Sequence, residues 1–168
     1  MSQSKALLRE FENEAATTRR VLERVPADKL TWQPHPKSMS LGRLAQHVAM
    51  SPGVIFGWAT QDVSEFGGER PPEPRSTADI LAAHDQSVSR VKEVLNGMSD
   101  EDFGKSWQAT MKGTALMSMP KGALIRAIGM NHIYHHRGQL SVYLRLLDVP
   151  VPSIYGPSAD ENPFAART

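Results

Sequence analysis

Four long segments of the chain repeat apolar residues at the spacing of an amphipathic α-helix. They cover residues 4–25, 41–60, 77–97 and 120–147, and stretches rich in proline and glycine separate them. We find neither a convincing run of alternating strands nor an internal repeat. Because an amphipathic helix must bury its apolar stripe against another element, four of them favour an all-α fold, a four-helix bundle.

Local signals set the expected ends of these helices. Ser40 is a suitable N-cap for the second helix, and Ser76 or Thr77 for the third. Pro120 suits the first turn of the fourth. Pro52 lies inside the second helix, where it predicts a kink or a break.

Two connections are longer than a compact bundle needs. Residues 61–76 read "QDVSEFGGERPPEPRS", a loop by composition. We expect residues 98–119 to be irregular, with a short strand or a turn around Trp107. Loops longer than about 12–15 residues are usually functional or disordered, and the sequence does not separate these two cases.

Size and composition describe an ordinary globular chain. Its 168 residues fit one domain, residues 1–168, and 40% apolar with 22% charged residues excludes a disordered composition. A formal net charge of +1 gives no reason to expect nucleic acid or an anionic membrane as partner. No apolar run is long enough to span a membrane, and the N-terminus lacks the apolar stretch of a signal peptide. We therefore expect a soluble cytoplasmic protein.

Cysteine is absent from the chain. This excludes disulfides, thiolate metal ligands and a cysteine nucleophile. Any metal ion must be held by histidine or oxygen ligands. Thiol chemistry would need a thiol that comes from outside the protein.

Three of the six histidines lie in one stretch of the fourth helix, "NHIYHHRGQL", residues 131–140. His132 and His136 are four residues apart, so both imidazoles lie on one helix face and can converge on one ion. His135 is a weaker choice, because adjacent residues on a helix point about 100° apart. By itself such a pair is more often two solvated or hydrogen-bonded residues than a metal site.

A third ligand should come from another helix, and His47 is the natural candidate. It lies in the middle of the second helix, next to the apolar stripe at Leu44 and Val48. Three neutral imidazoles suit zinc, nickel, copper or iron and leave positions open on the ion. For His84, on an apolar face, we favour a core histidine, and for His35, between two prolines, a loop surface.

Several motifs together resemble the DinB/YfiT-like superfamily of bacterial metal-binding four-helix bundles. Two of them carry the histidines of the second and fourth helices, and two others lead into the second helix or follow the fourth. They read "LGRLAQHVAMSPG", "NHIYHHRGQLSVYLRLL", "LTWQPHPKSMSLGRLAQHV" and "VPVPSIYGPSADE". The resemblance implies a metal triad of His47, His132 and His136 and favours His136 over His135. It also implies long crossing connections between the helices and a homodimer.

The resemblance leaves the reaction open, since the superfamily includes thiol transferases, ring-opening or hydrolytic enzymes and many proteins without an assigned reaction. Our first hypothesis is a metal-dependent enzyme for a small-molecule substrate, either a thiol transferase that uses a low-molecular-weight thiol or a hydrolase. The divalent ion would be zinc or nickel first, with iron or manganese as further options. The alternatives are a non-catalytic metal-binding or stress-related protein and a structural bundle without metal.

Residues beside the triad have open roles. Gln139 and Asn131 could accept the remaining ring protons of the histidines, but we slightly favour a surface contact or bundle hydrogen bond for both. Arg137 could meet an anionic substrate, but we favour an ion pair with a carboxylate of the first helix. The candidates are Glu10, Glu12 and Glu14. His135 could shuttle protons, but we favour a plain surface or interface histidine.

Overall fold

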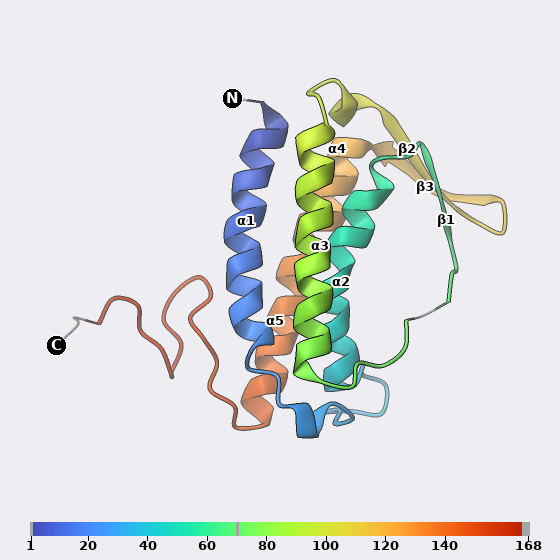
Figure 1. The fold of residues 1–168 in the computed structure, drawn as a ribbon. Helices are drawn as coiled ribbons and strands as arrows, with labels where there is room; N and C mark the ends of the chain where they lie inside the picture. Colours follow the sequence, from blue (N-terminus) through green and yellow to red (C-terminus); the bar gives the residue numbers. More distant parts are fainter. Residues whose placement is uncertain (1, 70, 166–168) are drawn as a thin grey trace.

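The computed structural model describes residues 2–69 and 71–165, and four long helical segments run along its length (Figure 1). The first three segments are single α-helices, and the fourth combines an α-helical turn, a π-helical stretch and a longer α-helix. They are α1 (Gln3–Leu22), α2 (Leu41–Trp58), α3 (Thr77–Gly97), α4 (Lys121–Ala123), η3 (Leu124–Met130) and α5 (Asn131–Leu146). Short 3₁₀ turns, η1 (Ala27–Lys29) and η2 (Asp102–Gly104), lie in the links.

Serine side chains begin the second and third helices, as the sequence predicts. The Oγ atoms of Ser40 and Ser76 each accept a hydrogen bond at 3.1 Å from the backbone N–H of the third residue beyond. Of the kink or break expected at Pro52, the break is wrong, because α2 continues through this residue, while the kink stays a prediction. Beside Pro52, the backbone N–H of Gly53 donates to the Oγ of Ser87 on α3 at 2.7 Å, which ties the two helices together.

The long link between α2 and α3 makes these two helices parallel. Gly53 lies against Ser87, and Gly57 lies near Arg90 one turn further along both helices. The chain leaves α2 at one end of the bundle and returns along its side to begin α3 at the other end (Figure 1). The expected long crossing connection is therefore present between α2 and α3.

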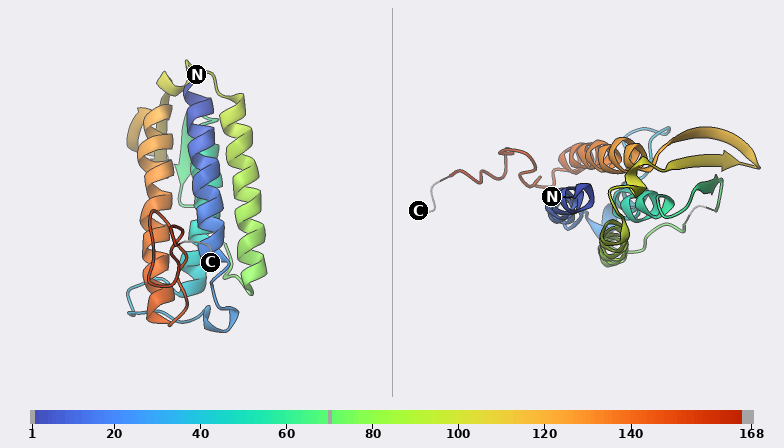
Figure 2. Two further views of the ribbon diagram at one scale, coloured as in Figure 1. Left: turned by 90° about the vertical axis from the view of Figure 1, so that its left-hand side faces the viewer. Right: turned by 90° about the horizontal axis from the view of Figure 1, so that it is seen from above.

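A three-stranded mixed sheet corrects the all-α expectation. Its strands are β1 (Val63–Phe66), β2 (Ser106–Met111) and β3 (Thr114–Pro120). β1 pairs in parallel with β2, and β2 pairs antiparallel with β3. Four helical segments are present, but both long links contain strands, so the fold is not purely α-helical, and only a strand or turn near Trp107 was expected. Seen from above, the β2–β3 hairpin and the C-terminal tail extend to opposite sides of the bundle (Figure 2).

Trp107 fastens the sheet to the bundle. Its side chain is fully buried, and its Nε1 donates a hydrogen bond to Ser64 Oγ of β1 at 2.9 Å. Trp58, the last residue of α2, stacks on it with ring centroids 6.0 Å apart. A buried indole N–H needs an acceptor, so this contact explains why β1 and β2 meet at the end of α2.

The hydrophobic core consists of two clusters stacked along the bundle axis, which we call the upper and lower clusters. The upper one gathers around Phe56 and Trp107, and the lower one around Leu44 and Leu144. On each helix, buried polar residues occupy the positions between the two clusters. These residues are Thr18 on α1, Ser51 on α2, His84 and Ser87 on α3, and Arg137 on α5. We call them the polar layer.

The π-helical stretch η3 brings the fourth helical segment close to α2. Gly129 lies in η3, and a Cβ placed on it would come within 2.8 Å of the ring of Phe56. Phe56 is fully buried, so its ring has little room to retreat. The close approach of the two helices therefore depends on a glycine at this position.

We expect Gly129→Ala to lower the free energy of unfolding by about 1–3 kcal/mol, because the added methyl overpacks the core against Phe56. Urea denaturation measures the change. Gly138→Ala on α5 is the matched control, since nothing lies within 4 Å of the added Cβ and alanine favours a helix. A Gly129 variant as stable as the control would contradict the tight contact.

Candidate metal centre

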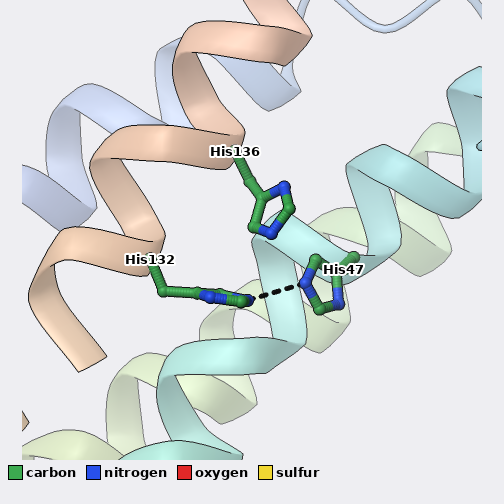
Figure 3. Close-up of side chains that lie close together, drawn as sticks. All are labelled: His47, His132 and His136. Atoms are coloured by element: carbon green, nitrogen blue, oxygen red, sulfur yellow. Dashed lines mark hydrogen bonds between the residues drawn. The ribbon is translucent and has the colours of Figure 1, made fainter. Parts of the chain in front are cut away.

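Three histidines from two helices face one another (Figure 3). His47 comes from α2, and His132 and His136 come from α5. One ring nitrogen of each lies within 4.8 Å of those of the other two. The structure thus brings together all three residues of the predicted triad. His135 is exposed and contacts only the edge of this cluster, with its ring centroid 4.7 Å from that of His136.

Buried apolar residues neighbour the three histidines on α2 and α5. Leu44 and Val48 flank His47 on α2, and Ile133 and Leu140 play the same part on α5. All four are buried, whereas the three imidazoles are only partly buried. Helix packing therefore fixes the backbone of the site while its rings remain within reach of solvent.

His47 and His132 hold each other by a direct hydrogen bond. Their Nε2 atoms are 2.7 Å apart, so one ring donates its proton and the other accepts it. Two imidazoles on one tetrahedral zinc ion would have these nitrogens about 3.3 Å apart, because each Zn–N bond is 2.0–2.1 Å. Holding an ion would therefore require the pair to separate slightly, with both ring protons on Nδ1.

Gln139 supports His136 from the side away from the cluster. Its Oε1 lies 2.7 Å from His136 Nδ1, so the amide oxygen accepts the ring proton. The contact lies on the exposed surface of α5, so it fits both readings left open for Gln139, a surface contact and an acceptor for the ring proton. Asn131 is exposed and, within the described parts of the chain, makes no side-chain hydrogen bond to the triad.

The site favours neutral imidazoles. Burial lowers the pKa of His47, and the neighbouring His136 lowers it further. Burial and the surrounding histidines lower the pKa of His132 to about 4. Burial also lowers the pKa of His136, although the hydrogen bond to Gln139 opposes this. Neutral rings have the free lone pairs that a metal ion requires.

The ligand set is uncharged. Among residues 2–69 and 71–165, the cluster consists of the three histidines alone, with no carboxylate. An ion held by three neutral ligands keeps its full positive charge, which makes it a strong Lewis acid. His47, His132 and His136 could therefore hold a divalent metal ion, and the geometry does not identify which one.

Arg137 points away from the triad and into the polar layer. It is 1% exposed, and its Nη2 lies 2.6 Å from Glu14 Oε2 of α1 and 2.6 Å from the hydroxyl of Tyr155. Its Nη1 donates to Thr18 Oγ1 at 3.1 Å. The expected ion pair with a carboxylate of the first helix is confirmed, with Glu14 as the partner. A buried and paired guanidinium is not available to an anionic substrate.

The remaining histidines lie where the sequence predicts. His84 is 4% exposed in the core, and its Nδ1 has no hydrogen-bond partner among the described residues. His35 is exposed in the link before α2. Neither belongs to the cluster of His47, His132 and His136.

The fold and the site together define a class of protein, a helical bundle with a three-histidine cluster that could hold a divalent metal. The sequence model of the DinB family matches residues 1–163, so the chain belongs to the DinB family. It is 28% identical over 154 residues to the uncharacterized protein YrdA of Bacillus subtilis (strain 168), an alignment that covers 92% of this chain and 89% of YrdA. It is 21% identical over 145 residues to the uncharacterized protein YjoA of the same strain, covering 86% of this chain and 91% of YjoA.

Solved structures share the fold. A DinB-like protein from Bacillus cereus ATCC 10987 superposes with a TM-score of 0.72 at 24% identity, covering 90% of this chain and 97% of that one. The DinB-like protein YjoA from Bacillus subtilis gives a TM-score of 0.66 at 18% identity, covering 86% and 96%. In the described part of this chain, no helix is both long and apolar enough to cross a membrane.

We expect the metal-free protein to lose stability as the pH falls from 7 to 5. Unfolded histidines take up protons near pH 6.5, whereas folded His132 does so only near pH 4, so the unfolded state binds more protons in this window. His132→Asn should reduce this loss by about 1–2 kcal/mol, since the partly exposed ring is partly screened.

Urea denaturation with a chelator at both pH values measures the difference. His35→Asn is the control, because this exposed ring belongs to no cluster. Equal losses in the His132 variant and the wild type would contradict the expectation.

We expect Arg137→Met to lower the free energy of unfolding by about 3–5 kcal/mol, because Glu14 loses its buried partner. Denaturant titration of the single variants and of the double variant with Glu14→Gln measures the coupling. The double variant should lose less than the sum of the single losses. Simple additivity would show that the two groups are not coupled.

Proposed function

We propose that this DinB-family chain is a metal-dependent enzyme that acts on a small molecule, as a thiol transferase or a hydrolase. One observation carries the proposal: three imidazoles from two helices converge at a seam that solvent can reach. Structural metal sites usually enclose the ion with four protein ligands, whereas three ligands leave room for a reactant. The partial exposure of the three rings supports the second kind of site.

The ligand set favours particular ions. Neutral imidazoles suit zinc and nickel, with iron or manganese as further options. A divalent ion at the site would supply Lewis acidity, which makes water or a thiol nucleophilic near neutral pH. The protein supplies the three imidazole ligands, His47 from α2 and His132 and His136 from α5.

The proposal includes partners. The substrate is a small molecule, and a low-molecular-weight thiol is the co-substrate in the transferase form of the proposal. A chain without cysteine has no thiol of its own to compete for the ion. We also propose a cytoplasmic homodimer without nucleic acid, which light scattering during size-exclusion chromatography tests by the mass in solution.

We expect one divalent ion per chain in protein purified without a histidine tag. X-ray fluorescence and elemental analysis give its identity and amount. His47→Ala, His132→Ala and His136→Ala should each reduce bound metal to near zero, because two imidazoles hold an ion poorly. His135→Ala is the matched control, since this neighbouring ring lies outside the cluster, and it should retain full metal. Wild-type protein that takes up no added zinc or nickel would refute the proposed site.

Activity assays separate an enzyme from a non-catalytic metal-binding protein. Metal-loaded protein is screened with low-molecular-weight thiols and electrophiles, and then with esters and amides. The proposed enzyme turns over at least one of these substrate classes. The His136→Ala variant should lose this activity. Wild-type protein should lose it when a chelator removes the metal and recover it when metal is returned. Full metal occupancy without turnover across the panel would favour the binding protein.

A further inference from the structure

The three imidazoles differ in what holds them. His47 and His132 bond to each other through their Nε2 atoms. His136 instead bonds through Nδ1 to Gln139, which lies outside the cluster. In the described chain, His136 is thus the one member of the triad that a side chain outside the triad orients by a hydrogen bond.

We propose that Gln139 is a positioning residue that keeps the ring proton of His136 on Nδ1 and so presents the Nε2 lone pair to the centre of the cluster. The role of Gln139 in metal binding rests on the function proposed above. The position of the His136 ring proton is a property of the metal-free protein and does not depend on that function. The two parts can therefore fail separately.

Helix geometry and amide chemistry support this role. Residues three apart on a helix are neighbours, so Gln139 reaches His136 from the next turn of α5. The contact of 2.7 Å joins an amide oxygen to a ring nitrogen. An amide oxygen only accepts, so the ring must donate from Nδ1 and its other nitrogen is free as an acceptor or ligand. A reversed amide would donate instead and would place the ring proton on Nε2, facing the centre.

The contrast with the other two histidines gives His136 a distinct role. In the His47–His132 pair, either ring can be the donor, and no outside side chain in the described residues decides between them. One of these rings must move its proton to Nδ1 before both can bind an ion. His136 already has a free Nε2, so it needs no change of proton position before it binds an ion.

Two substitutions at position 139 separate the effect of the hydrogen bond from the effects of side-chain size and helix propensity. Gln139→Met keeps a flexible side chain of similar length and good helix propensity but removes the acceptor. Gln139→Glu keeps an acceptor oxygen at the same distance along the side chain. Gln86→Met on α3 is the matched control, an exposed helical glutamine outside the site.

The first experiment records the ring ¹⁵N shifts of His136 by NMR in metal-free protein at pH 8, where the rings are neutral. We expect the proton on Nδ1 in the wild type, in Gln139→Glu and in Gln86→Met. In Gln139→Met the population with the proton on Nε2 should rise, because nothing holds the proton on Nδ1. A wild-type ring with its proton on Nε2, or shifts that do not change in Gln139→Met, would overturn the proposal.

The second experiment measures zinc affinity by competition with a chromogenic chelator. Removing the partner of a ligating histidine typically weakens metal binding 10–100-fold, so we expect a loss of about that size in Gln139→Met. Gln139→Glu should restore affinity, and Gln86→Met should leave it unchanged. The expected proton positions with unchanged affinity in Gln139→Met would refute the positioning role. The expected proton positions in a wild-type protein that binds no metal would refute the proposed function instead.

Discussion

The buried guanidinium of Arg137 is the constraint on which the rest of the structure depends. A charge that is 1% exposed must be paired, and among the described residues Glu14, Thr18 and Tyr155 supply its hydrogen-bond partners. These contacts allow one register of α5 against α1 and also fasten the C-terminal tail. Adjacent helical residues diverge by about 100°, so fixing Arg137 toward α1 turns His136 toward α2. The orientation of the candidate metal site therefore follows from an ion pair that is not part of it.

The polar layer explains why the site lies where it does. On each helix, the polar layer separates the apolar residues of the upper cluster from those of the lower cluster. Polar side chains in this layer are buried inside the core. Within this layer, Ser87 accepts a hydrogen bond from the backbone N–H of Gly53, and Arg137 pairs with Glu14. The three histidines lie on α2 and α5 beside this level, so the site extends a polar interruption that already exists in the core.

The sequence predicted the helices and the His132–His136 pair from local spacing, whereas His47, 85 residues away from His132, came from its place beside an apolar stripe and from the family resemblance. Apolar periodicity identified the helical segments, and the four-residue spacing placed His132 and His136 on one face. The sheet was harder, since β1 has four residues inside a loop-like composition and its anchor, Ser64 with Trp107, joins distant parts of the chain. The sequence also carries no usual signal for the turn between β2 and β3. Lys112 and Gly113 adopt φ of 50° and 75°, values for which Asn-Gly, and not Lys-Gly, is the usual sequence signal. For Gln139, spacing shows that its side chain can meet that of His136 but not that their rotamers make them bond.

The fold and the candidate site are separable in this protein. The bond between His47 and His132 gives two of the three rings a partner without any ion, and Gln139 gives the third one its own. Meanwhile α1 is fixed to α5 by Arg137, and α2 is fixed to α3 by Ser87. Small zinc domains fold only with their metal, because the ion replaces a core that they lack. Here two hydrophobic clusters already form the core, so binding energy at the triad does not have to hold the bundle together. The same reasoning explains why the rings can remain partly exposed, since the packing around them does not depend on burying them.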